Sequence, residues 1–405
     1  MDILIGVLYG VMSLLNPEIK AFYLVKYGFL MLTCYVILIL YVPHILKKCN
    51  IFEKKSIILL ICILIAMGIP TGIFKLYNPD YEITQYVRLS FFVPIIIYIL
   101  WKKRDFSSYL INFSFLINII GVFQFFFMGQ AGRVTGIFSH PNFYSIYLII
   151  VIIYILERLK FNSFYQKYNY FYYIYILFIL ALILFGTGAR TSFITIIVVL
   201  LFNFCLNLRK KPQSLFILIT IATLGFLLLI RFKSTLFQTR IFNLEYGNTY
   251  TNQVNSFEWR LLRWSDGLIE FTNQSVLGKI FGTGWQSSPL LSPTFKGFSM
   301  HNEYLRMLVD FGVVGLIIFL VMLVAFFSIG LKRIDLRGHY SLCLIMIVII
   351  IAGITENIFV SSESFSILVL SIANSFSTIQ FKIKDSKMIL REMDSATNKK
   401  IYEGV

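Results

Sequence analysis

The chain has 405 residues, of which 58% are hydrophobic and only 14% are charged. Soluble domains average about 45–50% apolar and about 25% charged residues, so the composition argues against a soluble enzyme, a disordered chain and a secreted disulfide scaffold. A net charge of +16 suggests nucleic acid binding in a soluble protein, but membrane proteins collect Lys and Arg in short cytoplasmic loops. We therefore expect a polytopic membrane protein that binds the lipid bilayer and no nucleic acid.

Apolar segments recur along the whole chain at lengths close to the roughly 20 residues that a spanning helix needs. They predict an all-α fold with about twelve transmembrane helices. The expected spans are residues 2–15, 22–46, 56–74, 84–101, 107–128, 143–157, 169–185, 191–208, 214–230, 303–330, 339–358 and 362–380. This divides the chain into nine spans within residues 1–230, a long loop over 231–300, three spans within 301–380, and a basic tail over 381–405.

The basic residues orient these spans. With twelve spans, well over half of the 36 Lys and Arg residues fall in loops on one face, together with the tail. The positive-inside rule then places both termini in the cytoplasm and the long loop on the extracytoplasmic side. The five cysteines lie mostly within apolar runs and have neither CxxC nor His-paired spacing. We therefore predict no metal site and no disulfide.

Two arginines on the extracytoplasmic side lie in polar, glycine-containing turns. Arg133 belongs to GRVTGIFSHPN and Arg190 to GTGARTS, where two glycines permit a tight turn before a helix. Guanidinium groups and helix N-termini both bind phosphate oxygens, which predicts an anionic ligand. The alternative is that the arginines snorkel to lipid phosphate. His140 in the first turn is either a ligand or base, or simply a hydrogen-bonded turn residue.

Within the long loop, apolar residues recur at helical spacing and predict an amphipathic helix lying across the membrane domain. These residues are Phe257, Leu261, Trp264, Leu268 and Phe271. At 100° per residue, Arg260 falls at the edge of this stripe and is expected to face inward, whereas Arg263 is expected to face solvent. The alternative is a plain surface helix with both arginines solvated.

The segment MHNEYLRMLVDFGVVG, residues 300–315, carries the most specific pattern. His301 immediately precedes a predicted span, where the helix dipole disfavours imidazolium, so we expect a neutral imidazole able to accept a proton. Gly312 and Gly315 are expected to let a neighbouring helix approach closely. Asp310 is expected to pair with Arg306. Two further acids, Glu356 and Glu363, flank a predicted turn; they are either part of a proton or cation pathway or simply hydrated.

These residues together resemble the O-antigen ligase/polymerase superfamily. The resemblance rests on HN-x9-GxxG (His301, Asn302, Gly312, Gly315), on Arg190 in its turn, and on WRLLRW followed by GTGW. It implies a fold like that of GT-C glycosyltransferases. It also implies a metal-independent transfer without cofactor from an undecaprenyl-diphosphate-linked glycan, at the periplasmic face of a bacterial inner membrane. A chain-length regulator is a further implied partner.

Carried over to this sequence, the resemblance implies that His301 is the base that deprotonates the acceptor hydroxyl. It implies that Arg190 and Arg260 hold the donor diphosphate, together with Arg133 and, more loosely, Arg88. The turn around Arg133 favours a Wzy-type polymerase over a ligase that transfers glycan to lipid A-core. A secondary transporter is the alternative from another class; the position of the long loop and the absence of an obvious internal repeat argue against it.

Overall fold

The structure is a computed structural model. It describes residues 92–102, 105–127, 133–161, 169–208, 256–292, 298–359, 361 and 364–379, with a few positions between 37 and 76. The predicted spans at 2–15, 22–46 and 214–230 and the basic tail therefore lie outside the described residues, apart from single positions. Arg88 and Glu363 also lie outside them.

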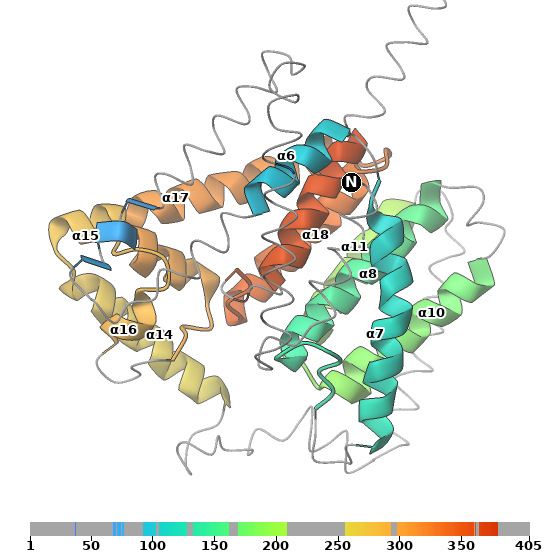
Figure 1. The fold of residues 1–405 in the computed structure, drawn as a ribbon, viewed down its shortest axis with the longest axis horizontal. Coiled ribbons are helices and arrows are strands. Elements are labelled where there is room, and N and C mark those ends of the chain that lie inside the picture. Colours follow the sequence, from blue (N-terminus) through green and yellow to red (C-terminus); the bar gives the residue numbers. More distant parts are fainter. Residues whose placement is uncertain are drawn as a thin grey trace, which may run out of the picture.

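The described part of the chain is helical throughout and contains no strand (Figure 1). Its helices, in chain order, are α6 (Phe92–Lys102), α7 (Ser107–Phe127), α8 (Pro141–Phe161), α10 (Asn169–Ala181), the π-helix η2 (Leu182–Thr187), α11 (Arg190–Leu208), α14 (Ser256–Asn273), α15 (Val276–Phe281), α16 (Ser288–Leu291), α17 (Glu303–Lys332) and α18 (His339–Thr355). One more apolar helix covers Ser364–Ile379.

Within the described residues, four helices are long and apolar enough to cross a membrane, as expected of a multi-pass helical membrane protein. They cover Ser107–Phe127, Pro141–Phe161, Tyr170–Thr187 and Glu303–Lys332. The second was predicted to be shorter, at 143–157. It begins earlier because Pro141 suits the first turn of a helix, and it continues through Glu157 and Arg158, which are buried and hydrogen-bonded.

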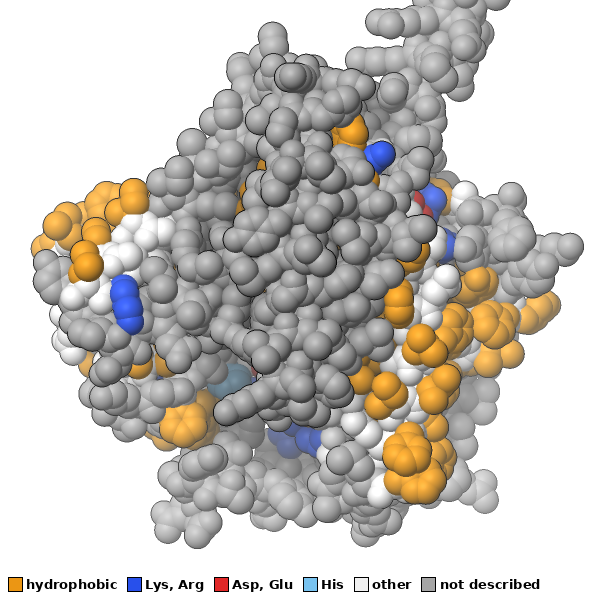
Figure 2. All heavy atoms as spheres, viewed as in Figure 1, with side chains coloured by type: hydrophobic (Ala, Val, Ile, Leu, Met, Phe, Trp, Pro, Cys, Tyr) orange, Lys and Arg blue, Asp and Glu red, His pale blue; other side chains and the backbone are white. Residues whose placement is uncertain are grey.

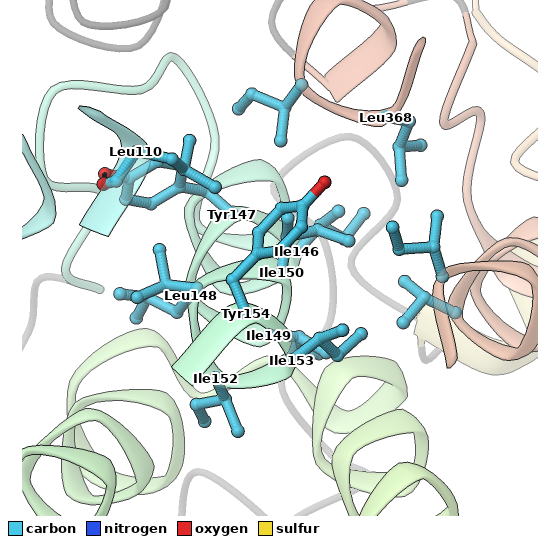
Figure 3. Packing of buried hydrophobic residues seen from close by; sticks show 14 of the residues in the cluster. Leu110, Ile146, Tyr147, Leu148, Ile149, Ile150, Ile152, Ile153, Tyr154 and Leu368 are labelled. Atoms are coloured by element: carbon cyan, nitrogen blue, oxygen red, sulfur yellow. Dashed lines mark hydrogen bonds between the residues drawn. The ribbon is translucent and has the colours of Figure 1, made fainter. Parts of the chain in front are cut away.

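Helix α8 forms the centre of the bundle. It packs against α7, α10, α11 and α18, and its aliphatic side chains from Ile146 to Ile155 are buried. Figure 3 shows these side chains directed toward helices on several sides, with Leu110 of α7 and Leu368 of the last helix among them. Because α8 is enclosed on all sides by protein, it needs no polar face.

The helices α14, α15 and α16 pack on α17 and form a separate layer, here called the loop unit (residues 256–292) (Figure 1). Their docking depends on Gly312, which breaks the helical backbone of α17 with φ 66° and ψ −170°. A Cβ at Gly312 would lie 2.4 Å from the backbone of Ile280, and one at Gly282 would lie 2.2 Å from the backbone of Asp310. The loop unit and the bent helix therefore meet backbone to backbone.

This contact revises the expected role of the two glycines of α17. Gly312 does admit a close neighbour, but that neighbour is the short helix α15 of the loop unit and not a spanning helix. At Gly315 a Cβ would meet Phe311 of the same helix at 2.1 Å. Gly315 is therefore required by the bend at Gly312 and not by a second helix.

Candidate active site

The buried carboxylate of Glu356 joins three distant segments of the chain. Its Oε1 accepts hydrogen bonds from Asn142 Nδ2 at 2.6 Å and from Arg260 Nη2 at 3.0 Å. Its Oε2 lies 3.6 Å from His301 Nδ1. The Glu356 residue is only 3% exposed. A buried carboxylate is stable only where such groups compensate for its lost hydration.

Helix ends bring these groups together. Glu356 caps the C-terminus of α18, where its own N–H bonds to Ala352 O. Asn142 is the second residue of α8, and Arg260 lies in the first turns of α14. His301 stands directly before Asn302, the N-cap of α17. The end of the bundle at which these termini meet is called the site end below.

The charge on Glu356 is set by this neighbourhood. Burial by itself would raise the pKa of its carboxyl, but the adjacent His301, the Arg260 guanidinium and the Asn142 amide together hold the pKa below its usual value. Glu356 is therefore an ionised carboxylate near neutral pH. Such a carboxylate favours the proton of a neighbouring imidazole on the nitrogen that faces it.

His301 is held in an unusual backbone conformation. Its φ of 50° is left-handed, which costs a non-glycine residue about 1–2 kcal/mol. The next residue fixes the start of α17, because Asn302 Oδ1 accepts the N–H of Leu305 at 3.0 Å. The Trp259 ring lies edge-on to the imidazole, with centroids 5.4 Å apart. The imidazole itself stays partly accessible, with 31% of its side chain exposed.

Arg133 connects the two glycine-containing turns that the sequence singled out. Its Nε donates to Thr187 O at 2.7 Å, and Val134 N donates to Gly186 O at 2.9 Å. Its Nη2 donates to Asn142 Oδ1 at 3.0 Å, and Asn142 in turn donates to Glu356. Arg133 therefore orients the amide that binds the central carboxylate.

Arg190 is exposed and is the first residue of α11. The preceding Gly188 has φ 57°, and it turns the chain from η2 into this helix. The hydroxyl group of the neighbouring Thr191 forms a 2.6 Å hydrogen bond with that of Thr355, the residue before Glu356. The backbone of Arg190 is thus fixed at the site end, next to the segment that carries Arg133.

His140 lies within electrostatic range of this cluster. Its Nδ1 accepts the N–H of Asn142 at 3.2 Å, which leaves the proton of the neutral ring on Nε2. Burial, Arg133, His301 and Arg260 lower the pKa of His140 to about 4, although Glu356 opposes the shift. A group so weakly basic is a hydrogen-bond donor and not a proton acceptor at neutral pH.

The predicted orientation of Arg263 is wrong. Instead of facing solvent it is fully buried and bonds Glu270 at 2.6 Å and Asp266 at 3.3 Å. It also donates to two backbone carbonyls, those of Phe298 and Ser288. Of the predicted apolar stripe, Leu261 and Leu268 are exposed, contrary to expectation, whereas Trp264 and Phe271 are partly buried. The side chain of Phe257 lies outside the described part of the chain.

Arg306 and Asp310 pair as predicted, at 3.0 Å, and Arg306 also binds Glu303. The Trp285 ring covers the guanidinium, 4.7 Å from its centroid. Asp310 in addition accepts the backbone N–H groups of Gln286 and Ser288. This buried cluster fastens the GTGW turn of the loop unit to α17 and so stabilises the helix that follows His301.

A family model described as O-antigen ligase matches residues 175–320. The match confirms the resemblance to the O-antigen ligase/polymerase superfamily. It includes Arg190, Arg260, His301 and the glycines of α17. A comparison with curated proteins finds no match.

The family match indicates a glycosyltransferase-like enzyme with a function of the O-antigen ligase or polymerase type. Glu356, Asn142 and Arg133 lie outside the matched residues, yet the structure places them against residues inside it. In the described part of the chain, no three His, Cys, Asp or Glu side chains lie close enough to hold a metal ion.

Sequence analysis did not identify Glu356 or Asn142 as site residues. Glu356 was considered only as a member of a proton or cation pathway or as a hydrated turn residue, and Asn142 only as the last residue of the GRVTGIFSHPN turn. Their separation of 214 positions along the chain hides the pairing. A weak signal existed, because a lone carboxylate at the end of an apolar span is costly and needs a partner.

Proposed function

We propose that this protein is a surface polysaccharide polymerase. It joins undecaprenyl-diphosphate-linked oligosaccharide repeat units by glycosyl transfer, with His301 as the general base. The observation that carries the proposal is the partly exposed imidazole of His301 held between Trp259 and the ionised carboxylate of Glu356. Such a pair can accept a proton and stabilise the resulting imidazolium.

The Glu356 carboxylate keeps the proton of the neutral imidazole on Nδ1, so the lone pair of Nε2 accepts the proton of the acceptor hydroxyl. The acceptor oxygen forms a bond to the anomeric carbon of the donor as the bond from that carbon to the phosphate oxygen breaks. The departing lipid diphosphate takes the electron pair, and displacement by one activated hydroxyl inverts the anomeric configuration.

Arginines stabilise the charge that develops on the leaving diphosphate. Arg260 engages Glu356 through Nη2, and a guanidinium has five N–H donors, so it can bridge the carboxylate and a phosphate oxygen. Arg190 stands at the N-terminus of α11, where the helix dipole adds to its charge. Arg133 has a supporting part here, since two of its nitrogens bind protein groups. Arg88 is proposed as a further contact from the sequence resemblance only.

The orientation of the charges supports a periplasmic reaction. Arg158, Lys332 and Arg337 lie at the end of the bundle opposite Glu356, where Asp105 binds both Arg158 and Arg337. If this basic end is cytoplasmic, the site end faces the periplasm, where lipid-linked repeat units are joined. We therefore propose an inner-membrane protein of about twelve spans with both termini in the cytoplasm.

The test is an incubation of the purified full-length protein with undecaprenyl-diphosphate-linked repeat units and no other acceptor. Wild type should give a ladder of glycans that still carry the lipid diphosphate, resolved on a gel. His301→Ala should abolish the ladder, since a positioned base contributes roughly 10²–10⁴-fold in rate. His339→Ala is the matched control, because His339 belongs to the other end of α18 and contacts Ile329 O.

The description of the matching family as O-antigen ligase favours one second function, transfer of the finished glycan to lipid A-core. If repeat units alone give no ladder but added lipid A-core becomes glycosylated, the protein is a ligase and the polymerase proposal is wrong. A ladder that survives in His301→Ala would retain the polymerase and refute His301 as its base.

A further inference from the structure

Over most of α14 the charged side chains are buried and uncharged side chains are exposed, which is the opposite of the arrangement expected for a helix in water. Between residues 261 and 273 all three charged side chains, Arg263, Asp266 and Glu270, are buried. The exposed positions of this stretch are all uncharged: Leu261, Leu262, Ser265, Leu268, Ile269, Thr272 and Asn273. The charged groups of this stretch therefore bind one another inside the loop unit, and its leucine and isoleucine side chains face outward.

The exposed apolar surface continues over α15. Val276 is 73% and Leu277 70% exposed, and Phe281 on the next turn is also more than half exposed. None of the described residues covers them. Contiguous apolar surface of this extent marks an interaction site or a membrane contact on a natural protein.

Beyond the bend at Gly312 the same surface passes onto α17. There Val313, Ile317 and Val321 are exposed, in a helix that qualifies as a membrane span and is mostly not buried within the protein. In Figure 2 hydrophobic side chains gather at the side of the molecule where Figure 1 places α15 and the adjoining end of α17. Since α17 crosses the bilayer, the exposed face of its spanning part contacts lipid chains.

The length of this spanning part locates α15 in the bilayer. From Val313 to Lys332 there are 20 helical residues, about 30 Å at 1.5 Å per residue, which equals the roughly 30 Å of hydrocarbon. Lys332 stands at the basic end of the bundle, so Gly312 lies near the boundary of the hydrocarbon at the site end. The end of α15 contacts Gly312 and therefore lies at that boundary too.

We propose that the loop unit is embedded in the lipid leaflet at the site end, with the outward faces of α14 and α15 in contact with acyl chains. Interfacial helices of this kind place their apolar face about 5–10 Å below the headgroups. The occupant of the surface is bilayer lipid, because the patch is largely aliphatic and continuous with the lipid-facing side of α17. Its one partly exposed charge is Lys279 of α15, and a lysine at this depth can extend its ammonium group to the headgroups. The inference is independent of the reaction proposed above.

The experiment measures which medium surrounds α15. A nitroxide is attached to the thiol introduced by Leu277→Cys in the full-length protein, after the five native cysteines (Cys34, Cys49, Cys62, Cys205, Cys343) are replaced by serine. The protein is reconstituted in phosphatidylethanolamine–phosphatidylglycerol vesicles. Power saturation then compares collisions with oxygen, which partitions into lipid, and with a water-soluble nickel chelate. Val276→Cys is the second site, should Leu277→Cys not reconstitute.

Two variants calibrate the measurement within the same protein. Glu258→Cys at the exposed start of α14, close to the site, should report water, and Val321→Cys in α17 should report hydrocarbon. The oxygen-to-nickel ratio at residue 277 should exceed that at 258 several-fold and approach that at 321. A ratio equal to that at 258 places the loop unit in water and overturns the proposal. Weak collisions with both reagents at 276 and 277 show that protein covers the surface, which overturns it as well.

Discussion

Each end of the bundle has a carboxylate bound by an amide and an arginine, but the other partners of the two carboxylates differ. At the site end Glu356 binds Asn142, Arg260 and His301. At the opposite end Asp105 accepts from Asn374, Arg158 and Arg337 and from the backbone of Ser107. Each carboxylate is held by an amide and by at least one arginine from segments far apart in the sequence. Each has a pKa below its usual value, although the loss of hydration opposes this shift.

The difference between the two clusters is chemical. All the cations around Asp105 are arginines, which keep their protons at any accessible pH, so that cluster can only hold helices together. Around Glu356 one partner is an accessible imidazole, which can take up a proton, and another is an arginine from the loop unit. An ion cluster therefore becomes a candidate site through its titratable, exposed partner and not through the carboxylate itself.

The largest expected effect is a loss of activity on substitution of Glu356, which substitution of Asp105 should not cause. Glu356→Gln should lower kcat about 10²–10⁴-fold, because an amide neither fixes the imidazole proton nor stabilises the imidazolium. Asp105→Asn is the matched control and should keep the rate per folded molecule. Both are measured as polymer formed by purified, monodisperse protein. Equal losses in the two variants would mean that Glu356 acts only by holding the fold.

The second-largest expected effect is the loss of activity on substitution of an arginine of the site. Arg260→Ala and Arg190→Ala should each lower activity about 10–100-fold, the value of one charge-assisted hydrogen bond, with little rescue by lysine, which lacks the planar fork. Initial rates over a range of lipid-linked substrate concentrations supply the test. Arg337→Ala, at the other end, is the comparison variant and should leave these rates unchanged. Full activity of Arg260→Lys would argue against bidentate binding of phosphate.

At the opposite end the expected effect is on stability. Arg337→Ala should lower the thermal unfolding temperature in detergent, because it removes a partner of both Asp105 and Glu157. The Asp105 carboxyl has a folded-state pKa below that of the unfolded chain. Its contribution to stability is therefore complete above about pH 4 and is lost only as the pH falls through the folded value. An unchanged unfolding temperature in Arg337→Ala would contradict this role.

The last expected effect is on the pH dependence of stability and concerns His140, which lies in the site cluster but is expected to stay neutral. Because its pKa falls to about 4 in the folded protein from an ordinary value near 6.5, protonation favours the unfolded chain. Stability should decrease as the pH falls from about 6.5 to about 4 and then level off. His140→Gln should reduce this dependence in thermal unfolding curves recorded across that range. An identical dependence in the variant would assign it to another group.

Within the described residues, the predicted spans agree well with the helices, because hydropathy is a local property. The predicted spans 107–128 and 303–330 correspond to helices at Ser107–Phe127 and Glu303–Lys332. The Arg306–Asp310 pair was also predictable, since residues four apart on a helix face each other. Glu356 was not, because its partners come from α8, α14 and the segment before α17, and no local pattern indicates which helix ends will meet.

The sequence predicted α14 but not which of its sides faces the protein. Composition and helical spacing alone determined a multi-pass helical protein, and they correctly placed Arg263 on the side of α14 opposite the apolar residues Leu261 and Leu268. Only the tertiary structure decided which side faces the protein: Arg263 is buried against Glu270, and the leucines are exposed. The physical reason is that periodicity reports how the two faces of a helix differ, whereas their direction depends on what packs against each face.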